Sequence, residues 1–124
     1  MSTSPRQRLG RLGEQLALEH LERMGFALVA RNHRTRWGEL DLVVCDGETL
    51  VFVEVKTRRS PGRAGGALDA FTPDKRARVR AMTRAWLAEV PERPRARELR
   101  LDAIAVTVDP RGGLVRLDHL EGAL

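Results

Sequence analysis

The stretch GELDLVVCDGETLVFVEVKT, residues 38–57, contains two apolar runs joined by an Asp-Gly pair. Asp-Gly between two such runs is a strong hairpin signal, so we expect antiparallel strands at residues 39–45 and 50–57. Three charged side chains interrupt the runs: Asp41 in the first, and Glu54 and Lys56 in the second. Because side chains alternate across a strand, Glu54 and Lys56 share one face. The stretch predicts neighbouring apolar strands that hold charged groups between them.

Asp41 is the least expected of these groups, because Leu40 and Leu42 flank it. A buried ionised carboxylate must be paired or bound to a metal ion. With a turn centred on Asp-Gly, Asp41 and Glu54 lie at comparable distances from the turn. Two converging carboxylates would form a hard oxygen site suited to Mg²⁺ or Mn²⁺, beside which Lys56 would stabilise negative charge or position water. A partly solvated Glu54–Lys56 ion pair at a strand end explains those two residues without a metal.

The remaining sequence predicts two helices and three more strands. Leucines at helical spacing indicate a helix over residues 6–24 that Gly25 ends. Thr72-Pro73-Asp74 begins a second helix, which runs to about residue 90. The other strands are expected at residues 26–30, 99–108 and 114–120. Residues 31–37 are predicted as a polar connection and residues 58–71, rich in Gly, as a mobile loop. The predicted order is α-β-β-β-α-β-β, an α/β fold.

Composition limits the function classes. With 124 residues, the chain is expected to form one domain. It has 22 Lys and Arg against 17 Asp and Glu, a net charge of +5, which favours a polyanionic partner such as nucleic acid. No apolar run approaches the roughly 18 residues that span a membrane, and residues 1–6 lack the apolar core of a secretion signal. We therefore expect a cytoplasmic protein without membrane contact, in which the lone Cys45 is a packed thiol.

Further candidates surround the predicted hairpin. Glu14 falls in line with Leu18 and Leu21 on the apolar side of the first helix, where it would either complete the acidic site or pair with a base. Glu39 shares a strand face with Asp41 and would either extend the site or begin the strand in solvent. The histidines, at residues 20, 33 and 119, show no spacing typical of metal ligands.

The basic side chains near the hairpin are candidates for contacts with phosphates. They are Arg34, Arg36, Arg58, Arg59 and Arg63, although a solvated charged surface explains them as well. Only two lysines occur in this Arg-rich chain, Lys56 and Lys75, which suggests positions where an ammonium is required. Lys75 would contact a phosphate or lie solvated in the first helical turn. We expect Trp37 to pack against the sheet rather than stack on a base.

Asp41-x12-Glu54-x-Lys56 resembles the signature of PD-(D/E)XK nucleases. A wider ordered set, spread from about residue 6 to residue 120, resembles the YraN family of bacterial proteins, whose fold is similar to that of archaeal Holliday-junction resolvases. The set consists of Gly13-Glu14, Asn32-x-Arg34, Gly38-Glu39-Leu40-Asp41-Leu42, Val53-Glu54-Val55-Lys56-Thr57-Arg58, Gly65-Gly66-Ala67, Thr72-Pro73-x-Lys75 and Arg100-Leu101-Asp102.

The resemblance implies a restriction-endonuclease-like core over residues 1–124, with a mixed central sheet flanked by helices. It implies that Asp41, Glu54 and the backbone carbonyl of Val55 bind Mg²⁺ or Mn²⁺, that Glu14 completes the site, and that Lys56 is catalytic. The implied activity is metal-dependent endonucleolytic cleavage of DNA, including branched or structured DNA. A two-site substrate would require a homodimer, with residues 114–120 as a candidate interface. The alternative is a non-catalytic nucleic-acid-binding protein that retains the nuclease fold.

Overall fold

The structure, a computed structural model, describes residues 3–61 and 71–124. Its elements follow the predicted order α-β-β-β-α-β-β. They are α1 (Pro5–Arg23), β1 (Ala27–Thr35), β2 (Gly38–Cys45), β3 (Thr49–Arg59), α2 (Pro73–Glu89), β4 (Glu98–Val108) and β5 (Leu114–Leu120). No helix in the described ranges is long and apolar enough to cross a membrane.

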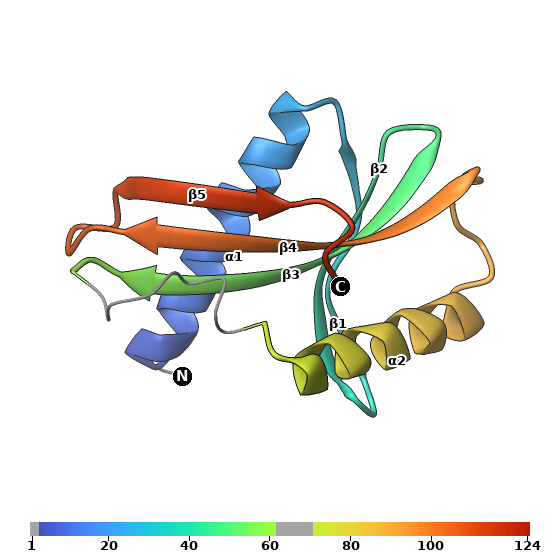
Figure 1. Cartoon of the computed structure of the whole chain (residues 1–124), viewed down its shortest axis with the longest axis horizontal. Coiled ribbons are helices and arrows are strands. Elements are labelled where there is room, and N and C mark those ends of the chain that lie inside the picture. The colour runs from blue at the N-terminus through green and yellow to red at the C-terminus, as the bar shows by residue number, and fades with distance from the viewer. Residues whose placement is uncertain (1–2, 62–70) are drawn as a thin grey trace.

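The strands form one mixed sheet in the order β1-β2-β3-β4-β5. Among the strands of the described residues, β3 and β4 pair in parallel with α2 as the crossover between them, and the other neighbours are antiparallel. The β1–β2 hairpin runs across the direction of β3, β4 and β5, while α1 and α2 lie on opposite sides of the sheet (Figure 1). This confirms the α/β architecture with a restriction-endonuclease-like core.

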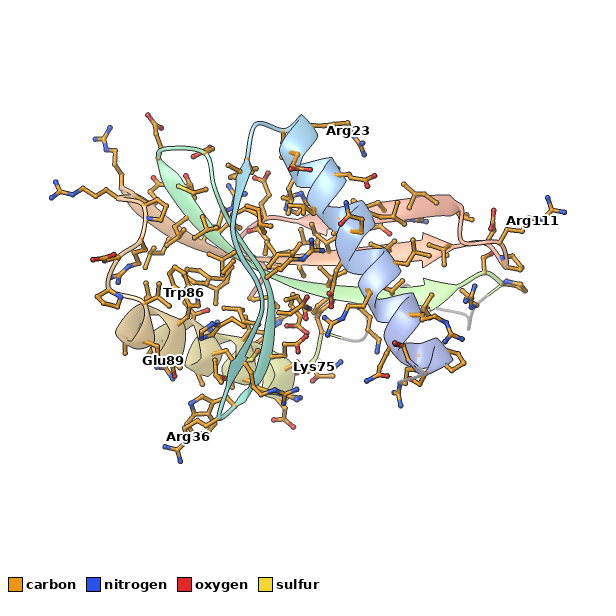
Figure 2. All side chains as sticks on the ribbon, turned by 180° about the vertical axis from the view of Figure 1, so that it is seen from behind. Arg23, Arg36, Lys75, Trp86, Glu89 and Arg111 are labelled. Atoms are coloured by element: carbon orange, nitrogen blue, oxygen red, sulfur yellow. The ribbon has the colours of Figure 1, made fainter. Side chains whose placement is uncertain are left out.

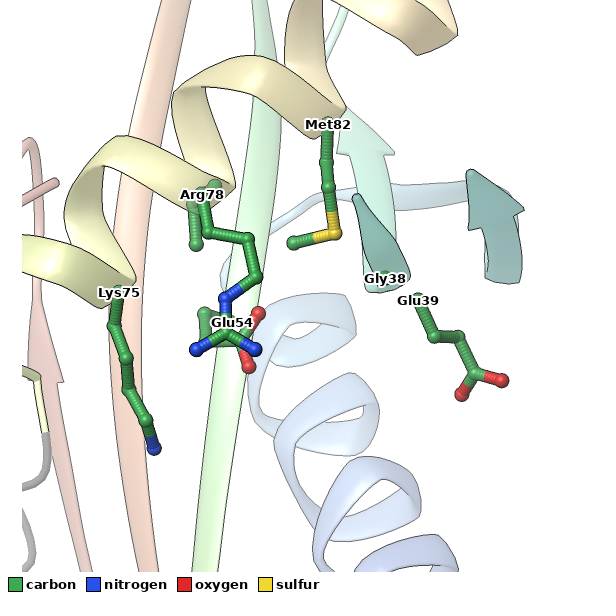
Figure 3. Close-up of a pocket in the computed structure, with 7 residues that line it drawn as sticks. Gly38, Glu39, Glu54, Lys75, Arg78 and Met82 are labelled. Atoms are coloured by element: carbon green, nitrogen blue, oxygen red, sulfur yellow. The ribbon is translucent and has the colours of Figure 1, made fainter. Parts of the chain in front are cut away.

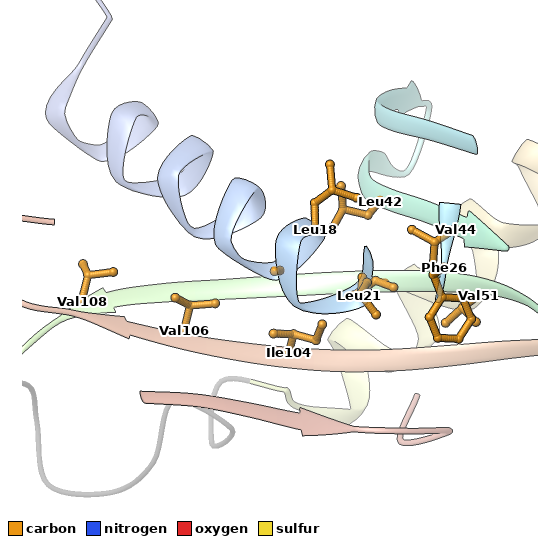
Figure 4. Close-up of a cluster of buried hydrophobic side chains, with 11 residues drawn as sticks. Leu18, Leu21, Phe26, Leu42, Val44, Val51, Ile104, Val106 and Val108 are labelled. Carbon is orange, nitrogen blue, oxygen red and sulfur yellow. The ribbon is translucent and has the colours of Figure 1, made fainter. Parts of the chain in front are cut away.

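Each helix buries one face of the sheet. Under α1, Val51 and Val53 of β3 belong to one buried cluster with Leu21 of the helix. Figure 4 shows Leu21 and Val51 in this cluster. On the other face, Phe52 packs edge-on against Trp86 of α2, at 5.5 Å between ring centroids. Burial of this apolar surface on both faces is the main force that holds the layers together. Cys45 is buried in the α2 layer, as a packed thiol should be.

Gly13 sets the distance between α1 and the sheet. A Cβ atom at this position would lie 1.7 Å from the side-chain hydroxyl of Thr57 on β3, so only glycine allows this approach. The N-terminus of the helix is held by a capping box between Ser4 and Gln7. The close contact places Glu14, the next residue of α1, beside the strands.

Two predicted boundaries are wrong. The expected polar connection at residues 31–37 continues β1 as far as Thr35, because these residues pair with β2 down to Gly38. Arg58 and Arg59 belong to β3 rather than to the expected loop, because their backbone pairs with β4. Ladder hydrogen bonds here outweigh the polar composition that indicated loops. The rest of the expected loop, with Arg63 and Gly65-Gly66-Ala67, lies mostly outside the described residues.

Candidate metal centre

The candidate site lies at the point where β2 and β3 separate, which we call the fork. Their pairing runs from Cys45–Leu50 to Leu42–Val53 and stops there, so Asp41 and Glu54 are the next residues on the two strands. Beyond this point β2 still pairs with β1, and β3 with β4. The backbone N–H of Val55 donates to Asp41 Oδ2 at 2.8 Å. The Asp41 carboxylate therefore takes the place of a strand partner at the fork.

Three carboxylates meet at this fork. Glu14 from α1 and Glu39 and Asp41 from β2 each offer an oxygen atom, and these atoms lie within 4.8 Å of one another. Glu14 and Asp41 are buried, and Glu39 is half-buried. Carboxylate oxygens at this separation are the ligands that hard divalent cations prefer. The structure thus brings Glu14 and Asp41 together with Glu39, for which the sequence left open a place in the site or at a solvated strand start, whereas Glu54 is not one of the three.

Two neighbours compensate part of this charge. Arg11 Nη1 lies 3.1 Å from both Glu14 Oε1 and Glu39 Oε1. Asn32 Nδ2 donates to the same two oxygens, at 2.8 and 3.0 Å. Asn32 has φ +51°, a conformation uncommon for residues other than glycine and often found at functional sites. Sequence reasoning missed the roles of Arg11 and Asn32, although an Asn within a strand is itself an unusual choice.

Glu54 approaches the cluster from the other strand. Its carboxyl group lies close enough to that of Asp41 for the two groups to act on each other electrostatically. Its buried Oε2 has no hydrogen-bond partner among the residues that the structure describes. It lines a cavity of about 110 Å³ between the hairpin and α2, with Lys75 and Arg78 on the helix side (Figure 3). Figure 3 shows Lys75, Arg78 and Glu54 around this cavity, and the charges of Lys75 and Arg78 act on the Glu54 carboxyl group.

The protonation of these acids reflects their crowding. Burial raises the pKa of Asp41 to about 9, and the nearby negative charge of Glu54 adds to the shift. Burial also raises the pKa of Glu54 to about 7, although Lys75 and Arg78 oppose that shift. Two neighbouring carboxyl groups with little access to water resist joint ionisation. A bound divalent cation would remove that cost, so the donor set and its electrostatics fit Mg²⁺ or Mn²⁺.

The lysines occupy different parts of the site. Lys56 is half-buried two residues after Glu54 and on the same strand face. Within the described ranges its ammonium makes no hydrogen bond or ion pair. Lys75 is half-buried and lines the cavity rather than lying solvated. Arg78, one helical turn further along α2, lines the same cavity and was missed. Its spacing from Lys75, in register with buried Val79 and Met82, was the available signal.

The other arginines lie around this centre with varied contacts. Arg34 Nη2 is 3.9 Å from Glu39 Oε2, and Arg59 Nη1 donates to the Pro110 carbonyl at 3.4 Å. Arg58 is half-buried on β3. The Arg36 guanidinium lies 5.0 Å from the centre of the Trp37 ring.

The expected packing of Trp37 is wrong. Its side chain is 48% exposed, because it lies in the turn beyond the paired part of the hairpin. Figure 2 shows its neighbour Arg36 at the free end of this hairpin, on the same side of the molecule as Lys75.

Asp102 belongs to a separate, structural network. It is fully buried and accepts hydrogen bonds from Arg100, from His119 Nε2 at 2.7 Å and from the Gly122 backbone. His119 Nδ1 in turn lies 3.0 Å from His20 Nε2 on α1. His33 pairs with Glu89 at the C-terminal end of α2. None of these three histidines is among the residues that line the acidic fork.

Comparison with known proteins agrees with the YraN resemblance. The model of "Uncharacterised protein family UPF0102", the YraN family, matches residues 13–106. The chain is 46% identical to a UPF0102 protein of Frankia alni, covering 99% of both chains. It is 49% identical to one of Frankia casuarinae, covering 93% of this chain and 94% of that protein. It is 44% identical to one of Mycobacterium tuberculosis, covering 98% and 96%. The chain therefore belongs to the UPF0102 family.

Proposed function

We propose that the protein is a metal-dependent endonuclease that hydrolyses phosphodiester bonds in DNA, built as a single nuclease-like domain over residues 1–124. The observation that carries the proposal is the convergence of carboxylate oxygens of Glu14, Glu39 and Asp41 at the fork between β2 and β3, where Glu54 is the next residue on the other strand. Cationic side chains adjoin the fork from β3 and α2. Acids that bind a divalent cation beside bases that bind phosphate are the components of metal-assisted phosphodiester hydrolysis.

The residues at the fork would have two roles, metal binding and stabilisation of charge on the phosphate. Asp41 and Glu54 would hold Mg²⁺ or Mn²⁺, together with the Val55 backbone carbonyl and Glu14. When bound, the cation would supply an activated water molecule and neutralise charge on the phosphate. Lys56, on the same strand face as Glu54, would stabilise the negative charge that develops on the phosphate oxygens.

The DNA would lie across the face that presents α2 and the end of the β1–β2 hairpin. Lys75 and Arg78 would hold a phosphate next to the one that is cleaved, because both line the cavity that contains Glu54. The outer cations Arg34, Arg36, Arg58 and Arg59 would bind the flanking backbone. Because the proposed substrate is DNA, we also propose that the protein acts in the cytoplasm.

Cleavage of both strands of branched DNA needs two sites, so we also propose a homodimer. β5 is an edge strand of the sheet, and Leu114, Val115 and Leu120 are exposed on it. An exposed apolar edge is suited to a second copy of the chain. Light scattering should give the mass of a dimer for the wild type and of a monomer for Leu120→Arg; a wild-type monomer at all concentrations would contradict this.

The nuclease proposal is tested by cleavage of labelled linear, flapped, single-stranded and four-way-junction DNA in Mg²⁺, Mn²⁺ or EDTA. We expect wild-type product only with metal, and losses of at least about 100-fold in Asp41→Asn, which removes a metal ligand, and in Lys56→Ala, which removes the cation beside the reacting phosphate. Glu22→Gln, an exposed acid on α1, is the matched control. Mn²⁺ should raise the melting temperature of wild type but not of Asp41→Asn. Full activity in Asp41→Asn or in EDTA would refute the proposal.

One observation favours the second candidate, a non-catalytic nucleic-acid-binding protein. Arg11 and Asn32 already satisfy oxygens of Glu14 and Glu39 without a metal ion. In this case DNA affinity would fall with salt and would not depend on metal. Tight binding without product at any Mg²⁺ or Mn²⁺ concentration would select this function.

A further inference from the structure

The turn of the β1–β2 hairpin holds an aromatic side chain in solvent. Thr35 Oγ1 donates to the Gly38 carbonyl at 2.9 Å and accepts from the Trp37 backbone N–H at 3.0 Å. Gly38 has φ +132°, a conformation that favours glycine. The turn is therefore fixed by its own hydrogen bonds and by its glycine. It holds Trp37 with 48% of its surface exposed, whereas Trp86 is 1% exposed.

Exposure on this scale is unusual for tryptophan, which is highly buried on average. The Arg36 guanidinium lies over the Trp37 ring, 5.0 Å from the ring centre. An indole beside a guanidinium is a typical platform for nucleic-acid bases, because stacking and cation–π attraction act together with the positive charge. The chemistry of this turn suits a flat ring attached to an anionic backbone.

The turn is joined to the candidate site. Gly38 lines the cavity that contains Glu54, Lys75 and Arg78. A Cβ atom at Gly38 would lie 3.7 Å from Arg78 Cδ and 3.5 Å from Met82 Sδ, so the hairpin end packs directly against α2. Trp37 is two residues from Glu39 of the acidic cluster, about 7 Å or less along an extended chain. The indole and the acids would therefore meet neighbouring nucleotides of one strand.

We propose that Trp37, supported by Arg36, stacks on an unpaired base, and that the substrate class is DNA with an unpaired base beside the cleaved phosphodiester. In a continuous duplex both faces of every base are covered by neighbouring bases. A free face occurs in single strands, flaps and junctions, which an outward indole can cover. The stacking rests on the geometry of the turn; its connection to cleavage rests on the proposed nuclease function.

Tryptophan fluorescence of the full chain in EDTA tests the stacking apart from catalysis. The probes are a single-stranded oligonucleotide, a flapped duplex and a blunt duplex. We expect the first two to quench wild-type emission. Trp37→Phe should show no quenching, because only buried Trp86 remains, and should keep most of the affinity, because Phe also stacks. Trp37→Ala should lose about tenfold in affinity for unpaired DNA and retain its affinity for the blunt duplex.

The control is Leu28→Ala, which removes an exposed apolar side chain that lies on β1 rather than in the turn, and it should behave as wild type. Unquenched emission, unchanged affinity in Trp37→Ala, or an equal loss for blunt and unpaired DNA would overturn the stacking proposal. Quenching without product in Mg²⁺ or Mn²⁺ would keep the stacking and reject the nuclease. Metal-dependent product without quenching would keep the nuclease and reject the stacking.

Discussion

At the scale of single residues, the site joins acids that are costly to bury with bases placed to offset them. The raised pKa values of Asp41 and Glu54 mean that the folded state retains protons that the unfolded chain releases. Above about pH 4 the unfolded chain releases these protons, whereas the folded protein keeps them up to about pH 7 on Glu54 and about pH 9 on Asp41. Both groups therefore lower the free energy of unfolding as pH rises over this range. Natural proteins accept such a cost at functional sites. Lys75 and Arg78, which oppose the Glu54 shift, reduce that cost from α2.

Arg78 offers a sharp test at this scale. In Arg78→Ala we expect about a tenfold loss of DNA affinity and a salt dependence reduced by about one counterion, because one phosphate contact is removed. Arg80→Ala removes the same charge from an exposed position outside the cavity and should change affinity by about twofold or less. Fluorescence anisotropy at several salt concentrations measures both. Equal losses in the two variants would show that only net charge matters.

At the scale of elements, the decisive contact is the approach of α1 to β3, because it carries Glu14 to the fork. Gly13→Ala would place a methyl group 1.7 Å from Thr57 Oγ1, so the helix must move away from the strand. We expect a loss of about 1–3 kcal/mol in the free energy of unfolding, typical of an overpacked contact. In Gly10→Ala, one turn earlier, the new Cβ atom would meet no atom of the described residues within 4 Å beyond its chain neighbours and its own helix backbone, so this change should stabilise the helix by up to about 1 kcal/mol. Urea unfolding of both variants measures the difference; equal effects would exclude the close-contact explanation.

At the scale of the whole molecule, a polar chain ties α1, β4, β5 and the C-terminal residues together. It runs from His20 through His119 to Asp102, which also accepts the Gly122 N–H. Burial lowers the pKa of His20, and the charges of His119 and Arg23 add to this effect. Burial alone would raise the pKa of Asp102, but hydrogen bonds from His119, Arg100 and Gly122 hold it below its usual value.

These shifts predict a pH dependence of stability. The unfolded chain takes up a proton on His20 near pH 6.5, whereas the folded protein does so only at lower pH, so stability is lost as pH falls below about 6.5. The contribution of Asp102 to stability persists until pH falls below the ordinary pKa of an aspartate, about 3.8.

Asp41 and Glu54 change the stability in the opposite sense, so the effect of His20 is measured by comparing a variant with wild type. The melting temperature of His20→Gln should fall less than that of wild type between pH 7 and 5. His33→Gln, which removes the pair with Glu89, is the control; identical slopes in wild type and His20→Gln would refute the prediction.

The sequence by itself determined the order of elements, the face on which Glu54 and Lys56 lie, and the presence of Asp41 in an apolar strand. These features follow from local patterns: side-chain alternation, helical spacing and a turn dipeptide. The extension of β1 to Thr35 was not foreseeable, because it depends on the ladder with β2.

Only the tertiary structure decided which charges meet. Glu14 and Glu39 are 25 positions apart, yet both share hydrogen bonds from Arg11 and Asn32. The tertiary structure likewise placed Arg78 in the same cavity as Glu54 and turned Trp37 to solvent. The physical reason is that such contacts depend on where β2 and β3 separate and on how closely two helices approach the sheet. Both are set by packing between distant segments rather than by any local pattern.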